Sequence, residues 1–308
     1  MVEMRQVFTD ALEELMVSDE RICVVDADLA RANGTLRLRE RFPERALDVG
    51  VAEANMASVA AGLASYGFVP FIATFSPFAT RRMCDQLALS IAYAKNNVKV
   101  VGTDPGITAE LNGGTHMAFE DLAITRAIPG MIIVEPVDNT QLRQVVRAAA
   151  DHVGPMYIRL ARRVQPDVFD ESYRFSLFTA DTLREGADVT ILATGIMAAK
   201  AMAAAELLSK KGCDPEVINV HTLKPLDNET ILRSIAKTKK VLTLENHSVI
   251  GGLYSAVCEL TAQEYPVKIN RIGVEDICGQ VGKLDELAEI YGLTVDAIVK
   301  KVSDILDL

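Results

Sequence analysis

The sequence lacks the basic clusters and the long apolar runs that would tie it to nucleic acids or to membranes. Its 308 residues hold 32 Lys and Arg against 42 Asp and Glu, and this net charge of −10 argues against a nucleic-acid surface. No apolar stretch reaches the roughly 18 residues that a membrane-spanning helix needs. Met1 is followed at once by Glu3, Arg5 and Asp10, so we expect no signal peptide. We therefore expect a soluble, cytoplasmic protein without nucleic-acid or membrane partners.

Paired cysteines are also missing. The five cysteines form no C-x-x-C motif and lie far apart, at Cys23, Cys84, Cys213, Cys258 and Cys278. This spacing argues against a zinc site and against a disulfide framework. It predicts buried free thiols in a reducing compartment.

Apolar residues make up 49% of the chain, and its length suggests about two domains. Short apolar strands alternate with amphipathic helices along most of the sequence. The expected strands are 22–25, 46–51, 69–74, 98–103, 131–135, 155–160, 188–193, 216–220, 241–245 and 267–274. The expected helices are 5–16, 36–42, 54–65, 77–94, 119–127, 140–151, 198–211, 227–236, 253–262, 284–290 and 295–305. This rhythm predicts an α/β fold with two domains, each a mostly parallel sheet flanked by helices.

We predict a first domain over residues 1–162, a linker over 163–187 and a smaller domain over 188–308. The linker segment lacks clear periodicity and carries Pro166 followed by the acidic residues Asp167, Asp170 and Glu171. Within the first domain, residues 104–117 form a glycine-rich segment, D-P-G-I-T-A-E-L-N-G-G-T-H-M, which we expect to be a long loop. Long loops in compact domains are usually functional or disordered.

The stretch 48–78 organises the first domain. A short strand leads into Glu53, a helix rich in Ala, Ser and Gly follows, and a second strand ends near Phe75, three residues before Phe78. The carboxyl ends of strands in open α/β sheets are where ligands bind. From pattern alone, however, this is an ordinary strand–helix–strand unit, in which Glu53 complements the helix dipole and both rings belong to the core.

The stretch resembles the pyrimidine-binding domain of transketolase-like thiamine diphosphate enzymes. G-V-A-E around Glu53 matches the characteristic glutamate of that family, and T-F-S-P-F at residues 74–78 matches its aromatic wall. The resemblance continues through G-G-T-H at residues 113–116 and E-N-H-S-V-I-G-G-L at residues 245–253. It covers nearly the whole chain.

The resemblance implies a catalytic role for Glu53 and for His116. The family glutamate hydrogen-bonds the aminopyrimidine ring of thiamine diphosphate and so helps to generate the cofactor's nucleophilic carbon. Phe75 and Phe78 would form the wall on which this ring stacks. The family histidine faces the hydroxyl and carbonyl groups of the donor sugar, where it can relay protons near neutral pH. A buried core role stays open for both phenylalanines.

Four further residues are assigned by the same resemblance. Asp28, Leu29 and Val51 are placed near the cofactor, although Asp28 could instead be a turn residue that caps a helix. Arg162 matches a family arginine that binds a sugar phosphate, a task suited to a guanidinium. Arg163 competes with it for that role.

The sequence departs from the family pattern at three positions. Arg81 stands where many transketolases have a third aromatic residue of the cofactor pocket, and it could contact a neighbouring subunit instead. Asn112 replaces the aspartate that recognises the donor, and Asp104 replaces a histidine that helps to bind phosphate. Because an acid is a poor phosphate ligand, donor and phosphate recognition are expected to differ from those of the common pentose-phosphate enzymes.

The chain also lacks G-D-G, the start of the family motif that binds Mg²⁺ and the diphosphate. We therefore expect an N-terminal transketolase subunit with this motif and the Mg²⁺ ligands, in an α2β2 heterotetramer that shares thiamine diphosphate across an interface. The chain is then predicted to be the C-terminal subunit of a split transketolase, which moves a two-carbon ketol unit from a ketose phosphate to an aldose phosphate. Two alternatives stay open: a 2-oxo-acid dehydrogenase E1 β-like or deoxyxylulose-phosphate synthase-like subunit, and a non-catalytic partner-binding subunit.

Overall fold

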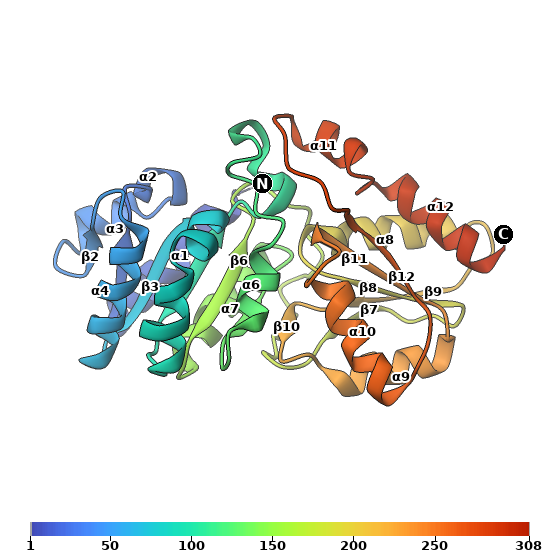
Figure 1. Ribbon diagram of the computed structural model, residues 1–308, viewed down its shortest axis with the longest axis horizontal. Coiled ribbons are helices and arrows are strands. Elements are labelled where there is room, and N and C mark those ends of the chain that lie inside the picture. Colours follow the sequence, from blue (N-terminus) through green and yellow to red (C-terminus); the bar gives the residue numbers. More distant parts are fainter. Residues whose placement is uncertain (1, 308) are drawn as a thin grey trace.

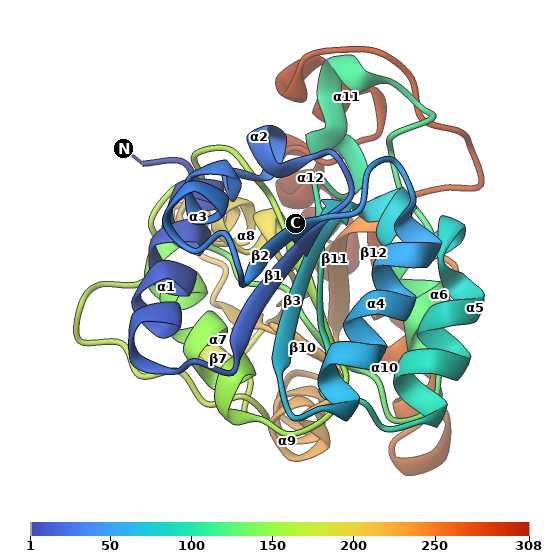
Figure 2. The ribbon, with the colours of Figure 1, turned by 90° about the vertical axis from the view of Figure 1, so that its left-hand side faces the viewer.

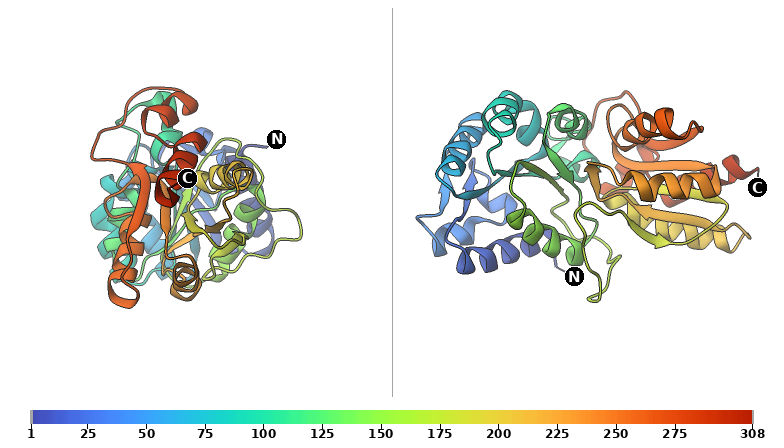
Figure 3. Two further views of the ribbon diagram at one scale, coloured as in Figure 1. Left: turned by 90° about the vertical axis from the view of Figure 1, so that its right-hand side faces the viewer. Right: turned by 90° about the horizontal axis from the view of Figure 1, so that it is seen from below.

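The protein's structure is a computed structural model that describes residues 2–307. Within these residues the strands form one sheet of seven strands and one of five. The two sheets lie side by side along the long axis, each with its own layers of helices (Figures 1 and 3). The prediction of an α/β fold with two mostly parallel sheets is confirmed.

The first sheet has the strand order β10-β5-β6-β4-β3-β1-β2. Every residue of β1, β3, β4 and β6 is buried, as expected for parallel strands that are covered on both faces. The strands are β1 (Ile22–Asp26), β2 (Ala46–Asp48), β3 (Val69–Phe75), β4 (Lys99–Thr103), β5 (Ile132–Val134), β6 (Met156–Leu160) and β10 (Thr222–Lys224).

Helices cover both faces of this sheet (Figure 2). α1 packs against α7 on one face, and α4 packs on β3 on the other face through buried alanines that allow a close approach. The helices are α1 (Met4–Ser18), α2 (Ala30–Asn33), α3 (Leu36–Arg41), α4 (Glu53–Ser65), α5 (Cys84–Gln86), α6 (Asp121–Ala127) and α7 (Asn139–Asp151).

The second sheet has the order β12-β11-β8-β9-β7. α8 packs against α12 on one face, and α10 packs against α9 on the other (Figure 1). One apolar cluster runs from α1 and β6 into β8 and α8, so the two sheets share a continuous core. The elements are β7 (Asp181–Arg184), β8 (Val189–Ala193), α8 (Ile196–Ser209), β9 (Pro215–Asn219), α9 (Asn228–Thr238), β11 (Val241–Ser248), α10 (Leu253–Glu264), β12 (Ile269–Val274), α11 (Leu284–Ile290) and α12 (Val295–Leu306).

Two strands were not expected from the sequence. β10 lies in the region predicted for the second domain, yet it pairs antiparallel with β5 and so extends the first sheet. β7 lies in the predicted linker and pairs antiparallel with β9. Both strands are short and gain their stability from a partner far away in the sequence, which local patterning does not reveal. The domain bounds themselves stay a prediction.

Two other expectations need correction. The predicted helix over 77–94 is broken into the π-helical turns η1 (Phe78–Arg82) and η2 (Leu87–Tyr93) on either side of α5. The predicted loop over 104–117 contains the 3₁₀ helix η3 (Gly106–Asn112), which is interrupted by Glu110 at a φ of 47°. π-Helical turns are frequent at functional sites.

The cysteines are free thiols, as predicted, but they are not all buried. Cys23 and Cys213 lie in the core, whereas Cys278 is exposed. Spacing in the sequence indicates that these residues are unpaired, but it does not determine their depth in the fold.

Candidate active site

The predicted site residues follow the carboxyl ends of neighbouring strands in the first sheet. Glu53 begins α4 shortly after β2, Phe75 ends β3, Asp104 follows β4, and Arg162 follows β6. The strands β6, β4, β3, β1 and β2 are consecutive in the sheet. Parallel strands therefore bring these side chains to one edge, where ligands bind in open α/β sheets.

Three rings predicted to belong together form one cluster. The ring centroids of Phe75 and Phe78 lie 6.0 Å apart, and the His116 ring lies 5.7 Å from Phe75 and 5.2 Å from Phe78. His116 approaches both rings edge-on, and its Nδ1 lies 2.9 Å from the Thr115 hydroxyl oxygen. The cluster offers aromatic surface with an imidazole at its edge, which suits a flat heterocycle beside a polar reactant.

Glu53 lies next to this cluster and is only 3% exposed. Its position at the N-terminus of α4 favours a carboxylate. Its Oε1 accepts a hydrogen bond of 2.6 Å from Arg82 Nη1, and the Arg82 guanidinium lies over the Phe78 ring, 3.9 Å from its centroid. Oε2 accepts no hydrogen bond from the described residues.

Arg82 was missed in the sequence analysis. The Arg81-Arg82 doublet directly after the F-x-x-F motif was the available signal, but only Arg81 was considered. Arg81 instead forms an ion pair of 2.9 Å with Glu120 and donates to the Thr115 carbonyl. The two neighbouring arginines thus point to different acidic partners.

Arg162, the predicted phosphate ligand, is paired with Asp104. Its Nε donates to Asp104 Oδ2 at 2.6 Å, its Nη1 donates to the Ala32 carbonyl, and its guanidinium lies 4.8 Å from the Phe75 ring centroid. The positive charge is therefore partly neutralised at the rim of the aromatic cluster. Arg163, its competitor, is mostly exposed and lies 3.3 Å from Glu110.

The remaining predicted residues stand apart from this arrangement. Asp28 and Asn112 are exposed, and Val51 is 72% exposed. The backbone N–H of Asp28 donates to Asp48, and Leu29 directly precedes α2. Across residues 2–307, none of these four side chains forms a hydrogen bond or ion pair with Glu53 or the aromatic rings. Their roles stay predictions.

The second domain supports the loop that carries His116. α11 packs against η3, and Figure 1 shows this helix beside the green loop. A Cβ on Gly114 would lie 2.2 Å from the Gly279 carbonyl oxygen, so the two backbones touch directly. The position of His116 therefore depends on both domains.

A buried charge network joins the domains beneath the site. Arg159 is fully buried, donates to Asp121 at 2.8 Å and to Glu135 at 2.6 Å, and reaches the Asn246 carbonyl at 2.7 Å. Burial opposes ionisation of Asp121, but the Arg159 charge outweighs it and holds the pKa of Asp121 below its usual range. Burial raises the pKa of Glu135.

The E-N-H-S segment reaches the same network from β11. His247 Nδ1 lies 2.7 Å from the Ser248 carbonyl, and its Nε2 accepts from the Leu122 N–H at 3.2 Å, so the neutral ring fits its surroundings. Burial lowers the pKa of His247 to about 4. Burial raises the pKa of Glu245 to about 8, although two backbone N–H groups of α10 donate to it.

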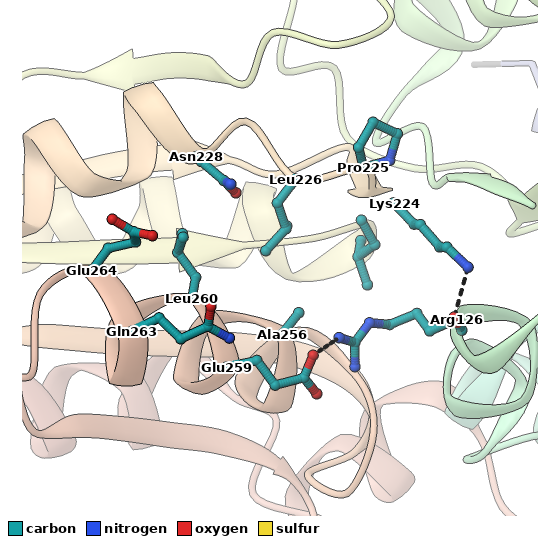
Figure 4. Close-up of a pocket in the computed structure, with 11 residues that line it drawn as sticks. Arg126, Lys224, Pro225, Leu226, Asn228, Ala256, Glu259, Leu260, Gln263 and Glu264 are labelled. Carbon is teal, nitrogen blue, oxygen red and sulfur yellow. Dashed lines mark hydrogen bonds and ion pairs between the residues drawn. The ribbon is translucent and has the colours of Figure 1, made fainter. Parts of the chain in front are cut away.

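A separate cavity of about 390 Å³ lies at the seam between the domains (Figure 4). Arg126 crosses it to Glu259 at 2.7 Å, and Lys224 donates to the Arg126 carbonyl. None of the residues that line it belongs to the aromatic cluster. We treat it as part of the domain interface.

Over residues 2–307, no group of three or more His, Cys, Asp or Glu side chains is placed to hold a metal ion. In the same range, no helix is both long and apolar enough to cross a membrane. The site chemistry therefore consists of one buried carboxylate, an aromatic wall, a histidine and two paired arginines. A carboxylate beside aromatic rings fits the aminopyrimidine of thiamine diphosphate, which presents a flat face and ring nitrogens.

Comparison with known families decides the relationship. A family model described as "Transketolase, pyrimidine binding domain" matches residues 1–166, and one described as "Transketolase, C-terminal domain" matches residues 179–298. The chain belongs to the transketolase family. Two relatives of about the same length are named as transketolase subunits, and one similar structure is described as a split-gene transketolase.

One such relative is the 6-deoxy-6-sulfo-D-fructose transketolase subunit SqwH of Clostridium sp. (strain MSTE9), which is 53% identical over 99% of this chain and 94% of its own length. An apulose-4-phosphate transketolase subunit of Phocaeicola vulgatus is 35% identical over 97% of this chain and 96% of its own. A solved structure described as "split gene transketolase, inactive beta4 tetramer" is 42% identical, with a TM-score of 0.92 over 100% of this chain and 99% of the other.

The chain spans about half the length of some other proteins that it matches. The chain covers 47% of the 1-deoxy-D-xylulose-5-phosphate synthase of Heliobacterium modesticaldum, at 34% identity over 98% of this chain. A transketolase structure from Pichia stipitis, 20% identical, superposes with a TM-score of 0.83 on 99% of this chain and 46% of that one. This last comparison shows a likeness of fold.

Proposed function

We propose that the chain completes a thiamine diphosphate-dependent transketolase when it joins a partner subunit. The reaction is the transfer of a two-carbon ketol unit from a ketose with a terminal anionic group to an aldose phosphate (EC 2.2.1.-). The observation that carries this proposal is the buried Glu53 carboxylate beside the cluster of Phe75, Phe78 and His116.

The partner is an N-terminal transketolase subunit with the G-D-G motif and the Mg²⁺ ligands, in an α2β2 heterotetramer. Two observations support it. The chain has no G-D-G, and it covers about half the length of single-chain family members but nearly all of other split subunits. The cofactor would then bind at the interface of the two subunits.

Each side chain of the cluster has a defined task in this proposal. Glu53 holds the aminopyrimidine ring and shares a proton with a ring nitrogen, and Phe75 and Phe78 stack against that ring. His116 holds or relays a proton at the donor's hydroxyl and carbonyl oxygens. Bound thiamine diphosphate supplies the nucleophilic carbon that attacks the donor carbonyl.

The pairing of Arg162 with Asp104 favours a donor whose terminal anion carries a low charge. A phosphate monoester carries about −1.5 to −2 charges at neutral pH, whereas a sulfonate carries one. A neutralised arginine attracts a dianion less strongly than a free one does. We therefore propose a 6-sulfonated ketose, the donor class named for the 53% identical relative, as an alternative to a ketose phosphate.

A second candidate function is a synthase of the 1-deoxy-D-xylulose-5-phosphate type. Its support is the 34% identity to such synthases over 98% of this chain. A 2-oxo-acid dehydrogenase E1 β-like role belongs to the same class of reaction. Both release CO₂ from a 2-oxo acid, whereas ketol transfer releases none.

The test is to combine the chain with a G-D-G-bearing subunit encoded nearby, thiamine diphosphate and Mg²⁺. Ketol transfer is assayed with fructose 6-phosphate and with 6-deoxy-6-sulfofructose as donors, and CO₂ release is assayed with pyruvate. We expect ketol transfer, and we expect Glu53→Gln to lower it by at least about a hundredfold, a size typical for general acid–base groups. Glu20→Gln, at an exposed position, is the matched control. Full activity of Glu53→Gln, or CO₂ release alone, contradicts the proposal.

A further inference from the structure

Arg82 contacts a buried carboxylate and an aromatic ring at the same time, whereas its neighbour Arg81 pairs with a different acid. The Arg82 guanidinium donates to Glu53 at 2.6 Å and at the same time lies over the Phe78 ring at 3.9 Å. Among the described residues, Glu53 is its ion-pair partner and Phe78 its ring partner, and its side chain is 46% exposed. Arg81, equally exposed, is paired with Glu120 instead.

Both contacts have a counterpart in the cofactor site proposed above. A guanidinium is a flat, delocalised group whose edge carries N–H donors, and it stacks on aromatic rings. An aminopyrimidine is likewise flat, stacks on aromatic rings and hydrogen-bonds through its edge. Arg82 therefore meets the same carboxylate and the same ring that the cofactor would meet.

We propose that Arg82 occupies the pyrimidine position in the cofactor-free chain and leaves it when thiamine diphosphate binds. This inference rests on the proposed function, and it makes Arg82 an internal competitor of the cofactor. Arg82 is a positioning residue in the free chain, because it holds Glu53 in place without taking part in ketol transfer.

The chemistry of the two groups explains why Arg82 has to leave. A guanidinium has no acceptor and does not release its proton in proteins, so a Glu53 bound to it cannot exchange a proton with its partner. The task proposed for Glu53 requires a shared proton with a ring nitrogen. A site that kept Arg82 in place would hold the carboxylate and block its chemistry.

The energetics allow the exchange. A buried carboxylate without a partner is costly, so Glu53 gains from Arg82 while the cofactor is absent. The pair is open to solvent on the arginine side, and such ion pairs contribute little, as does an exposed cation–π contact. The half-exposed side chain can therefore turn into solvent when a better partner for Glu53 arrives.

The test measures binding of thiamine diphosphate with Mg²⁺ to the reconstituted two-subunit complex by titration calorimetry. We expect Arg82→Gln to bind about fivefold more tightly than the wild type, and Arg82→Lys to lie between them, because an ammonium keeps the charge but does not stack flat. Arg147→Gln removes a surface partner of Glu14 and serves as the control with unchanged affinity.

A second measurement covers the case in which Arg82→Gln alters the fold. Millimolar methylguanidinium should refill the emptied position in Arg82→Gln and raise its apparent dissociation constant for the cofactor, with little effect on the wild type. Unchanged or weaker cofactor binding in both Arg82 variants overturns the inference and leaves the proposed function intact. Failure of the wild-type complex to bind thiamine diphosphate, or wild-type affinity in Glu53→Gln, overturns the proposed function itself.

Discussion

Asn246 binds the backbone on both sides of Gly106. Its Nδ2 donates to the Pro105 carbonyl at 3.0 Å, and its Oδ1 accepts from the Ile107 N–H at 2.9 Å. Gly106 has a φ of 56°, and a Cβ at this position would lie 2.3 Å from Asn246 Oδ1. A side chain of the second domain thus fixes the start of the loop that carries His116.

The first prediction concerns this contact. Asn246→Ala leaves the buried Ile107 N–H without its partner, which costs about 1–3 kcal/mol, whereas the Pro105 carbonyl still accepts from the N–H and the hydroxyl of Thr108. We expect faster hydrogen exchange in residues 105–117 and a ketol-transfer rate about tenfold lower, since small misplacements of catalytic groups are expensive. Asn139→Ala, which removes an exposed bond to Val2, is the control. Equal exchange in the loop of both variants would show that Asn246 does not hold it.

The second prediction concerns Arg159, whose charge balances the acids in the domain interface. Arg159→Met leaves the buried carboxylates of Asp121 and Glu135 without their cation, and breaking a buried pair in this way costs about 3–5 kcal/mol. Urea denaturation should show this loss in the free energy of unfolding. Arg147→Met, at the surface, should cost less than about 1 kcal/mol. Adding Asp121→Asn and Glu135→Gln to Arg159→Met should recover part of the lost stability. If Arg159→Met alone is as stable as the wild type, Arg159 does not balance these acids.

The third prediction concerns acid sensitivity through His247. Because its pKa in the folded chain is lowered from 6.5 to about 4, the unfolded chain binds the proton more readily. The stability that neutral His247 contributes is therefore present above about pH 6.5 and is lost as the pH falls through 4. The loss approaches about 3 kcal/mol at roughly 1.4 kcal/mol per pKa unit.

The measurement is the free energy of unfolding at pH 7 and pH 4.5 for the wild type and for His247→Gln, which keeps an acceptor for the Leu122 N–H. Glu245 has the opposite sign, since its pKa is raised to about 8 and stability rises as the pH falls from 8 toward 4.5. Glu245 is present in both proteins, so their difference reports His247 together with its 3.8 Å contact with Glu245. An equal loss in the two proteins would exclude the histidine as the cause.

Local patterns carried the prediction as far as the fold class and the position of Glu53 after the carboxyl end of a strand. The strand before Glu53 has clear apolar periodicity, so the sheet edge at which Glu53 lies followed from the rules of parallel sheets, whereas the grouping with Phe75, Phe78 and His116 came from the family resemblance. Their chemical roles stay predictions that rest on family resemblance. The order of strands and helices along the sequence was therefore the part of the structure that could be predicted.

Pairings between side chains that are far apart in the sequence could not be predicted. Arg82 meets Glu53 across 29 positions and Arg162 meets Asp104 across 58, and no spacing rule selects these partners over other acids. The three-residue strand β10 was missed for a similar reason, because its pairing with β5 depends on the packing of the two domains. The π-helical turns after Phe75 were also missed, because apolar periodicity does not distinguish them from an α-helix.

The fourth prediction separates the two donor classes through Asp104. Asp104→Asn keeps a side-chain acceptor for Arg162 but removes the negative charge that neutralises the guanidinium. Residue 104 has a φ of 51°, a conformation in which asparagine is among the favoured residues, so the backbone tolerates the change. A freed guanidinium attracts a phosphate dianion more than a sulfonate, because the electrostatic attraction grows with the charge of the ligand. We expect kcat/KM for fructose 6-phosphate to rise about tenfold relative to that for 6-deoxy-6-sulfofructose, which is about 1.4 kcal/mol. Asp214→Asn, which breaks a distant ion pair with Arg184, should leave this ratio unchanged. If Asp104→Asn leaves the ratio unchanged as well, Arg162 does not face the anionic end of the donor, and Arg163 becomes the residue to test.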